Sequence, residues 1–327
     1  MKNRKIIGIT VCIVLMLAIV IALAGYIWYH MDIASAQEDD SGTMQNDQED
    51  VVYYQGKEYR YNSDLVNVLF LGIDTSEEVT LQEMPGTAGQ SDSILLLSMN
   101  KKEHTVRILQ VSRDAMTDID LLDVSGNYVT SIEAQVATQY AYGNGEKSSC
   151  WAAKKTISEL LYSLPIDAYL SMNLEGISII NDAVGGVTLT LSEDATQIDD
   201  SFQKGKTVTL TGKQAEAFVR YRNTAVSGSN QNRMERQMQY LPALLKAIRN
   251  KVGNSGDYYQ TFYSLLEPYT VTDLSADQIN ELASCDLNDD VETVPGTLQA
   301  GEEHDEFYVD DDALYALIID MFYQEIR

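Results

Sequence analysis

The sequence predicts an α/β domain, an α-β-α sandwich around a mixed central sheet, behind a single N-terminal transmembrane helix. Two observations lead to this prediction. From about residue 65 onward, short apolar runs alternate with amphipathic segments, and intermixed strands and helices are typical of a sheet covered by helices. Before that, residues 6–29 contain no charged side chain, and an apolar stretch of this length can cross a bilayer as one helix.

The charges around the apolar run predict its orientation. The basic residues before it are Lys2, Arg4 and Lys5, and every acidic residue follows it. Because basic residues favour the cytoplasmic side, we expect a cytoplasmic tail at 1–5, an anchor in the cell membrane at 6–29 and an extracytoplasmic remainder. A cleaved signal peptide is the alternative, since 34–36 reads ASA, although the apolar run is longer than such peptides use.

The part beyond the anchor is strongly acidic. It holds 20 of the 23 Lys and Arg residues and all 49 Asp and Glu residues, which is a formal charge of −29. Such a charge repels nucleic acid, which is therefore not an expected partner. An anionic substrate would need a local basic site or a metal ion. Polar residues at 30–52 predict a flexible tether, and 53–327 is long enough for one large domain.

Cysteine and histidine place limits on the chemistry. Beyond the anchor lie only Cys150 and Cys285, and an extracytoplasmic pair can form a disulfide, which the sequence leaves open. The three histidines are scattered along the chain. This scarcity argues against a zinc site or a histidine-activated nucleophile.

Each predicted element follows from a local pattern. Apolar runs predict strands at 67–72, 93–99, 105–111, 168–172 and 187–191. Helical spacing predicts helices at 148–163, 174–184, 211–220, 233–252 and 311–326, and one more after Ser275. Two capping-box patterns, Thr211 with Gln214 and Ser275 with Gln278, mark helix starts. The glycine pair at 185–186 ends the helix before it.

Two aspartates are the first candidates for chemistry. Asp74 lies just past the first predicted strand, and Asp92 lies just before the second. If these strands are antiparallel neighbours, the two carboxylates meet at one edge of the sheet. A pair of carboxylates without histidine or cysteine suits Mg²⁺, which commonly takes one or two carboxylates plus substrate phosphates. The alternative is a pair of ordinary turn aspartates.

Arginine is concentrated in one short segment of this acidic chain. Between 211 and 237 lie four of the ten arginines, Arg220, Arg222, Arg233 and Arg236. The planar guanidinium matches phosphate or carboxylate with two hydrogen bonds, so the cluster predicts a bound oxyanion. Arg233 and Arg236 are three residues apart and share a helix face. The alternative is a solvated face paired with nearby acids. Arg113, next to Asp114, is either part of an ion pair or a further ligand at this edge.

Seven short motifs occur in order behind the anchor: NVLFLGID at 67–74, GQSD at 89–92, VSRD at 111–114, DAVGGV at 182–187, LTGKQA at 210–215, VRYR at 219–222 and RMERQ at 233–237. The series resembles the LytR-CpsA-Psr family. The resemblance covers about 65–247, and 248–327 looks like the usual C-terminal extension of an extracytoplasmic LytR-CpsA-Psr-like domain at 53–327.

The resemblance implies a membrane-anchored enzyme of the Gram-positive cell envelope, a phosphotransferase-type ligase that depends on Mg²⁺ or Mn²⁺. It would transfer an anionic glycopolymer, of teichoic acid or capsular polysaccharide type, from a polyprenyl pyrophosphate carrier to peptidoglycan. It also implies an α/β sandwich with an apolar tunnel for the polyprenyl chain, lined by the helices at 148–163, 174–184 and 233–252. A polyprenyl-pyrophosphate hydrolase and a non-catalytic lipid- or glycan-binding protein are the alternatives.

Family roles carry over to this chain by position. Asp74 and Asp92 would hold the metal; Arg113, Arg220, Arg222, Arg233, Arg236, Gln237 and Gln90 would line the pyrophosphate; Asp92, Arg113, Arg220 and Arg222 are the catalytic candidates. Metal and arginines would neutralise the leaving pyrophosphate while a peptidoglycan hydroxyl attacks the first sugar. Asp92 is the candidate base, with Asp74 as the alternative.

Three positions depart from the family pattern. Gln90 stands where many members have arginine, which removes one cation. Glu133, in SIEA at 131–134, stands where members often have asparagine, and is a possible further metal ligand or base. The segment 230–232 (NQN) replaces an acidic-glycine approach to the last arginine pair. These departures predict a divergent subgroup.

Overall fold

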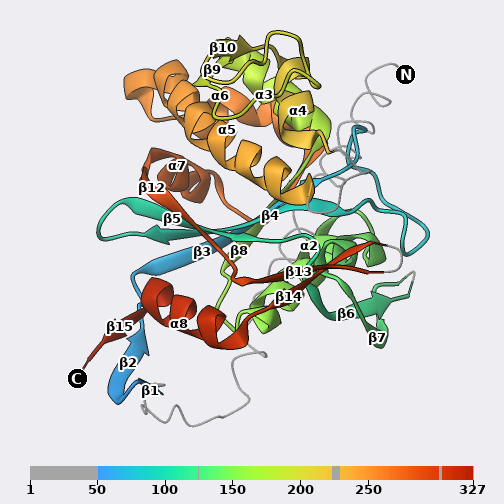
Figure 1. The fold of residues 1–327 in the computed structure, drawn as a ribbon, viewed down its shortest axis with the longest axis vertical. Coiled ribbons are helices and arrows are strands. Elements are labelled where there is room, and N and C mark those ends of the chain that lie inside the picture. Colours follow the sequence, from blue (N-terminus) through green and yellow to red (C-terminus); the bar gives the residue numbers. More distant parts are fainter. Residues whose placement is uncertain (1–50, 124, 223–228, 302–303, 327) are drawn as a thin grey trace, which may run out of the picture. The chain divides into compact units, whose positions relative to one another are not determined.

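A computed structural model describes residues 51–123, 125–222, 229–301 and 304–326, which form one compact unit from Val52 onward (Figure 1). At its centre is a six-stranded sheet with the order β11-β8-β3-β4-β5-β12. The strands are β3 (Leu65–Ile73), β4 (Ser91–Asn100), β5 (Thr105–Val111), β8 (Ala168–Asn173), β11 (Thr270–Thr272) and β12 (Asp286–Thr293). β3, β4 and β5 are antiparallel neighbours, whereas β8 and β12 run parallel to β3 and β5. The predicted mixed central sheet is confirmed.

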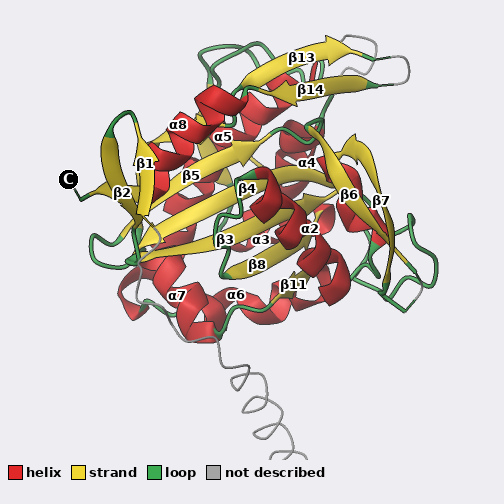
Figure 2. Cartoon of the chain, turned by 90° about the horizontal axis from the view of Figure 1, so that it is seen from below, coloured by secondary structure: helices red, strands yellow, loops and turns green. Residues whose placement is uncertain are grey.

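Helices cover both faces of this sheet, because apolar side chains on alternating strand positions point to opposite sides. Leu69 and Leu71 of β3 pack with α2 (Lys147–Leu160) and α8 (Asp311–Phe322). Phe70 faces the other way, toward α5 (Ser229–Val252) and α7 (Ala276–Ser284). Figures 1 and 2 show α5 and α7 on the side of the sheet opposite α8. The α-β-α sandwich follows from this double burial.

A smaller lobe with its own core packs against α5 (Figure 1). It joins α3 (Leu174–Ala183), the hairpin of β9 (Val187–Thr190) and β10 (Thr207–Leu210), and α4 (Gly212–Arg220). Phe202 and Phe218 are fully buried there, edge to face with ring centroids 5.8 Å apart. Thr211 caps α4 through the predicted capping box. The lobe thereby sets the position of the arginines at the C-terminal end of α4.

The remaining elements are short and decorate the sandwich. They are β1 (Val51–Tyr54), β2 (Lys57–Tyr61), β6 (Met116–Leu122), β7 (Tyr128–Gln135), β13 (Gly296–Ala300), β14 (Asp305–Val309), β15 (Tyr323–Glu325), α6 (Tyr258–Leu266), and the 3₁₀ turns η1 (Val136–Tyr142), η2 (Gly253–Ser255) and η3 (Glu267–Tyr269). β6 pairs with β7 and β13 with β14 as two-stranded ribbons. None of these elements was predicted from the sequence.

Several predicted boundaries were wrong: α5 begins at Ser229 instead of residue 233, and α2 ends at Leu160 instead of residue 163. The C-terminal helix was expected at 311–326, but α8 ends at Phe322 because Tyr323 pairs with Tyr61 as an added strand. The tether was expected to reach residue 52, but β1 begins at Val51. The predicted strand at 105–111 matches β5 residue for residue, and the second predicted capping box, at Ser275, begins α7.

The predicted anchor at 6–29 lies outside the described residues. Within residues 51–326, leaving out the gaps at 124, 223–228 and 302–303, no helix has the length and apolar character to cross a membrane. The disulfide left open by the sequence does not form, because Cys150 and Cys285 are both free thiols. Cys150 packs on the α2 face of the sheet and Cys285 on the α7 face, so the sheet separates them.

Candidate functional site

The two predicted aspartates meet at the edge where β3 ends and β4 begins. Ile73 pairs with Ser91 across the strands. Asp74 donates its backbone N–H to the Gln90 carbonyl (3.0 Å), and its Oδ1 accepts the Gln90 N–H (2.7 Å). Gly89 precedes this turn with φ of +82°, a conformation that glycine adopts without strain. The loop from 75 to 90 therefore returns to the same edge, and the predicted neighbourhood of Asp74 and Asp92 is confirmed.

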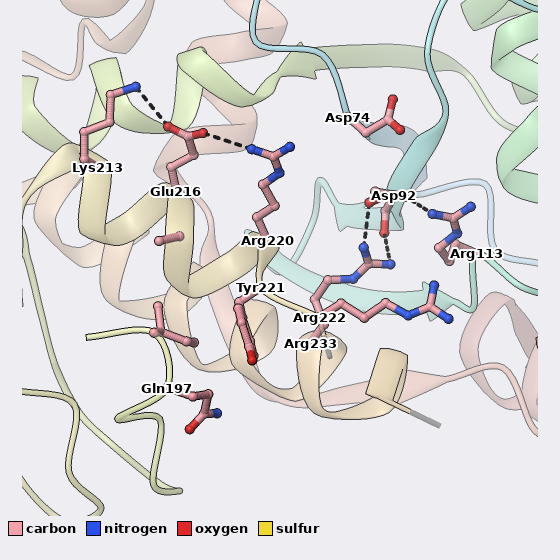
Figure 3. A pocket seen from close by; sticks show the side chains of 12 residues that line it. Asp74, Asp92, Arg113, Gln197, Lys213, Glu216, Arg220, Tyr221, Arg222 and Arg233 are labelled. Carbon is pink, nitrogen blue, oxygen red and sulfur yellow. Dashed lines mark hydrogen bonds and ion pairs between the residues drawn. The ribbon is translucent and has the colours of Figure 1, made fainter. Parts of the chain in front are cut away.

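Both aspartates line a cavity of about 640 Å³, shown in Figure 3. Its lining consists of Asp74, Asp92, Arg113, Gln197, Ile198, Lys213, Glu216, Ala217, Arg220, Tyr221, Arg222 and Arg233. The arginines come from the end of β5, the end of α4 and the first turns of α5. Six of the sequence-predicted site residues are thus brought together by segments more than 100 residues apart.

Asp92 lies between two of the arginines. Its Oδ1 accepts a hydrogen bond from Arg113 Nη1, and its Oδ2 accepts one from Arg233 Nη1 (2.6 Å). The Arg233 side chain is only 3% exposed. Gln90 Oε1 accepts from the other amino group of Arg113. The glutamine that replaces a cation here therefore orients Arg113, and both oxygens of Asp92 are already engaged.

A buried carboxylate lies beneath the arginine cluster. Asp114 is fully buried and accepts hydrogen bonds from Gln135 Nε2 (2.9 Å) and Asn230 Nδ2 (2.7 Å). Burial raises the pKa of this carboxyl, and the nearby Arg113 acts in the opposite direction. Burial also lowers the pKa of the Arg233 guanidinium, while Asp92 raises it. Asn230, one of the departures from the family pattern, also accepts from Arg233 Nη2 (2.7 Å) and so joins Asp114 to Arg233.

The C-terminal segment also reaches this cluster. Asp305, at the start of β14, pairs with Arg222 at 3.6 Å, and its backbone carbonyl accepts from Gln135. The Phe307 N–H donates to the Asp114 carbonyl (2.8 Å). Nothing in the local sequence indicates these contacts, because they join β14 to the end of β5 across nearly 200 residues. The Arg-Asp pair at 113–114 was the one local signal for this buried layer.

The other half of the cavity belongs to the small lobe. Glu216 of α4 pairs with Lys213 (3.1 Å) and lies 3.7 Å from Arg220. Lys213 also pairs with Glu175 of α3 (2.9 Å). Tyr221 is the C-cap residue of α4, and both arginines beside it line the cavity. Sequence reasoning missed Lys213 and Glu216, although their spacing on a capped helix places them on one face.

Besides Gln90, three sequence-predicted residues do not line the cavity. Arg236 donates to the carbonyls of Phe218 (2.8 Å) and Tyr221 and pairs with Glu193 (2.9 Å). Gln237 donates to the Val219 carbonyl (3.2 Å). Both side chains hold the C-terminal end of α4 instead of facing the cavity. Glu133 lies exposed on β7 opposite Asp118, outside the cavity, so its expected role as metal ligand or base is wrong.

The cavity has donors that suit a hard cation. Asp74 and Asp92 supply carboxylate oxygens from one wall, and Mg²⁺ is commonly held by one or two carboxylates plus substrate phosphate oxygens. Among the described residues no group of three or more His, Cys, Asp or Glu side chains could hold a metal ion. The two aspartates therefore fit a cation that arrives with a phosphate, and not a fully protein-coordinated ion.

A second cavity, of about 240 Å³, is almost entirely apolar. It lies between the sheet and α5, α6 and α7, with side chains such as Phe70, Leu170, Leu245 and Phe262 in its wall. The expected contribution of the helices at 174–184 and 233–252 to an apolar tunnel agrees with this lining, through Ile180 and the leucines of α5. The helix at 148–163 was wrongly included, because α2 packs on the opposite face of the sheet.

Comparison with known proteins agrees with the fold and the motif order. The model of the LytR_cpsA_psr family matches residues 25–316. This chain belongs to the LytR-CpsA-Psr family. The resemblance read from the motifs at 65–247 is therefore confirmed, and the family match extends well into the C-terminal segment.

Named LytR-CpsA-Psr relatives are moderately similar to the chain. The polyisoprenyl-teichoic acid–peptidoglycan teichoic acid transferase TagU of Bacillus mycoides is 29% identical over 72% of this chain and 70% of TagU. Among solved structures, the protein gbs0355 of Streptococcus agalactiae gives a TM-score of 0.62 at 23% identity, covering 79% of this chain and 86% of that one. TagU of B. subtilis gives a TM-score of 0.55 at 20% identity, with 79% and 95% covered. The solved structures support the shared α/β fold.

Proposed function

We propose that this protein transfers an anionic glycopolymer of the teichoic acid type from a polyprenyl pyrophosphate carrier to peptidoglycan. The observation that carries the proposal is the convergence of Arg113, Arg222 and Arg233 on one cavity beside two aspartates, in a chain of formal charge −26. Such a cationic site in an acidic protein fits a pyrophosphate anion. The activity named for the TagU relative supports the same reaction class.

The arginines are held in place before any substrate binds. Asp114, Asn230 and Gln90 hydrogen-bond to them or to one another, and Asp305 pairs with Arg222. Hydrogen-bond donors fixed in a partly buried site stabilise developing charge without the cost of reorganisation. We therefore assign Arg113, Arg222 and Arg233 to the phosphate oxygens, with Arg220 at the rim. Its side chain is 56% exposed.

We propose attack on phosphorus in place of the attack on the first sugar that the resemblance implied, because the guanidinium groups lining the cavity can stabilise charge on phosphoryl oxygens. In this reaction a peptidoglycan hydroxyl oxygen bonds to the phosphorus that carries the glycan, and the bond from that phosphorus to the bridging oxygen breaks. Polyprenyl monophosphate leaves, and the hydroxyl proton passes to solvent or to a carboxylate. Both Asp92 oxygens accept hydrogen bonds from arginine in the absence of substrate, and we do not assign Asp92 as the base. A bound Mg²⁺ or Mn²⁺ would add neutralisation of the phosphoryl oxygens.

The apolar cavity is the proposed place for the first part of the polyprenyl chain. Leu245, Phe262 and Cys285 are among its lining residues. Transfer of an apolar chain from water into contact with such a lining is favourable. Cys285 offers a direct test, since polyprenyl monophosphate should slow its alkylation by an apolar maleimide. Cys150, on the opposite face of the sheet, is the internal control. Equal rates with and without lipid would place the chain elsewhere.

The reaction requires an extracytoplasmic site, because peptidoglycan lies outside the membrane. We propose that residues 6–29 anchor the protein as a single span with residues 1–5 in the cytoplasm. The uncharged run and the three basic residues before it support this orientation. A reagent that labels only surface-exposed cysteine, applied to intact cells carrying Asn46→Cys, should modify the tether. No labelling would contradict the orientation.

The decisive assay supplies donor and acceptor together. The full chain in detergent is incubated with a short-chain lipid-pyrophosphate glycan, Mg²⁺ and peptidoglycan oligomers, and the products are identified by mass spectrometry. We expect a phosphodiester-linked product and lipid monophosphate, lost in Arg222→Ala and Asp92→Ala but retained in Glu133→Ala. Release of lipid pyrophosphate would show attack on the sugar. Glycan phosphate without ligation would show a hydrolase, and binding without turnover would show a carrier protein.

A further inference from the structure

The position of Asp92 resembles that of a bound anion. Each of its carboxylate oxygens accepts from a different guanidinium, Oδ1 from Arg113 and Oδ2 from Arg233, and Arg233 also reaches the Asp92 carbonyl (3.4 Å). Carboxylate and phosphate present oxygens to arginine in the same way. In Figure 3 the Asp92 side chain lies between these two arginines at the cavity wall. Asp92 therefore occupies the guanidinium N–H donors that a phosphate in this cavity would need.

Asp74 stands in a different environment on the same wall. Its Oδ1 accepts the backbone N–H of Gln90 (2.7 Å). Among the residues that the structure describes, no arginine or lysine lies within ion-pair distance of the Asp74 carboxylate. A phosphate entering the cavity has no hydrogen bond to take from Asp74. The two aspartates thus differ in one respect: only Asp92 competes with an anion for arginine.

We propose that Asp92 changes partners when the donor binds. The diphosphate takes over Arg113 and Arg233, and the released Asp92 carboxylate turns, together with Asp74, toward a divalent cation. The inference rests on the proposed diphosphate site and deepens it. It assigns Asp92 as the residue that couples binding of the anion to binding of the cation.

The coupling follows from charge. Without the anion, the positive charges of Arg113, Arg222 and Arg233 repel a divalent cation in the cavity. The negative charge of Asp92 is already compensated by arginine, so the cation binds weakly. Without the cation, a diphosphate must leave Asp92 unpaired beside a new negative charge, so the anion also binds weakly. When both ligands bind, the anion offsets the positive charge that weakens cation binding, and the cation compensates the charge of the released Asp92. By thermodynamic reciprocity, the cation increases the affinity for the anion by the same factor as the anion increases the affinity for the cation.

The buried layer makes such an exchange possible. Asp114 and Asn230 hold the cluster from below through bonds that do not involve Asp92. Gln90 holds Arg113 from the side. When Asp92 leaves, these contacts keep the guanidinium groups in place to receive the phosphate oxygens.

Calorimetric titration tests the proposal without relying on turnover. The full chain in detergent is titrated with imidodiphosphate, a non-hydrolysable diphosphate, with and without Mg²⁺. For the wild type we expect Mg²⁺ to tighten binding by about 10-fold, within the range usual for coupled sites. Asp92→Asn should bind the metal-free anion several-fold tighter than the wild type, and should lose most of the Mg²⁺ effect.

Two matched variants separate exchange from general charge effects. Asp74→Asn should bind metal-free imidodiphosphate as tightly as the wild type does and should lose most of the Mg²⁺ effect. Because Mg²⁺ binds the anion in solution equally in both titrations, this variant also serves as the control for that binding. Glu216→Gln removes another acid from the same cavity and should tighten metal-free binding less than Asp92→Asn. Thermal melting verifies that each variant is folded, and Asp92→Ser replaces Asp92→Asn if that variant is not.

The outcomes distinguish the two proposals. Metal-free binding by Asp92→Asn that is no tighter than wild type, or equal tightening in Glu216→Gln, overturns the exchange while leaving the diphosphate site intact. A Mg²⁺ effect that persists in Asp74→Asn also overturns it. If the wild type binds imidodiphosphate in neither buffer, both the exchange and the proposed function fail.

Discussion

Replacing Arg236 with alanine is expected to destabilise the domain far more than it changes the chemistry of the cavity. The side chain is 3% exposed. It donates to the Phe218 carbonyl (2.8 Å) and the Tyr221 carbonyl and pairs with Glu193 (2.9 Å). Removing one partner of a buried, charged hydrogen-bond group costs about 3–5 kcal/mol. For a domain of this size, that corresponds to a fall in Tm of roughly 6–20 °C.

Arg222→Ala is the matched comparison. Its side chain is 23% exposed and meets Asp305 at 3.6 Å, a longer contact than the hydrogen bonds made by the more deeply buried Arg236. We expect this variant to melt above Arg236→Ala and to lose turnover. Arg236→Lys should fall between the wild type and Arg236→Ala in stability, because lysine retains the charge without the planar fork.

Thermal melting and donor binding, measured on the same preparations, check this division. If Arg236→Ala melts within about 2 °C of the wild type and fails to bind imidodiphosphate, the structural role assigned to Arg236 is wrong. Arg236 would then contact the pyrophosphate directly, as the sequence motif implied. If Arg222→Ala melts as low as Arg236→Ala, the two arginines share a structural role and the division also fails.

Three further predictions test the fold around the site. Thr211→Ala should lower the free energy of unfolding by about 1 kcal/mol through loss of the capping box of α4; an unchanged urea midpoint would contradict this. Gly89→Ala should cost about 1–3 kcal/mol and reduce turnover, because φ is +82° and the new Cβ would lie 2.9 Å from Asp74 Oδ1; full turnover would show that the turn is not critical. Burial raises the pKa of the Cys150 thiol from 9.0 to about 12, so the folded state keeps a proton that the unfolded chain loses. The free energy of unfolding should therefore fall as pH rises above 9, and Cys150→Ala should flatten that slope; equal slopes would contradict the burial.

Local patterns predicted the centre of the fold well. β5 follows a polar turn and carries apolar residues at Val106, Ile108, Leu109 and Val111, so its limits could be read directly from the sequence. The neighbourhood of Asp74 and Asp92 followed from two strands joined as antiparallel neighbours. Both capping boxes form, at Thr211 and Ser275, because they depend only on residues three apart.

Long-range pairing could not be predicted in the same way. β12 joins the sheet beside β5 from 175 or more residues further along the chain. The end of α8 depends on the pairing of Tyr323 with Tyr61, not on helix propensity. Asp305 reaches Arg222 only because β14 packs against the end of β5. Each of these contacts is invisible to a reading of local spacing.

The arginine motif shows the same limit within a single helix. Arg233 and Arg236 are three residues apart on α5, and the sequence predicted that both would line one site. In the structure Arg233 pairs with Asp92, whereas Arg236 turns to the last carbonyls of α4. Side-chain direction depends on which neighbours offer acceptors, and those neighbours come from other segments.

A crystal structure of the protein with a short-chain lipid-pyrophosphate glycan would locate both halves of the donor. We expect the pyrophosphate within hydrogen-bond distance of Arg113, Arg222 and Arg233, with Asp92 turned away from the arginines. We expect the lipid between the sheet and α5, in contact with Cys285. A pyrophosphate bound outside this cavity, or a lipid chain on the α2 face of the sheet, would show that the assigned donor site is wrong.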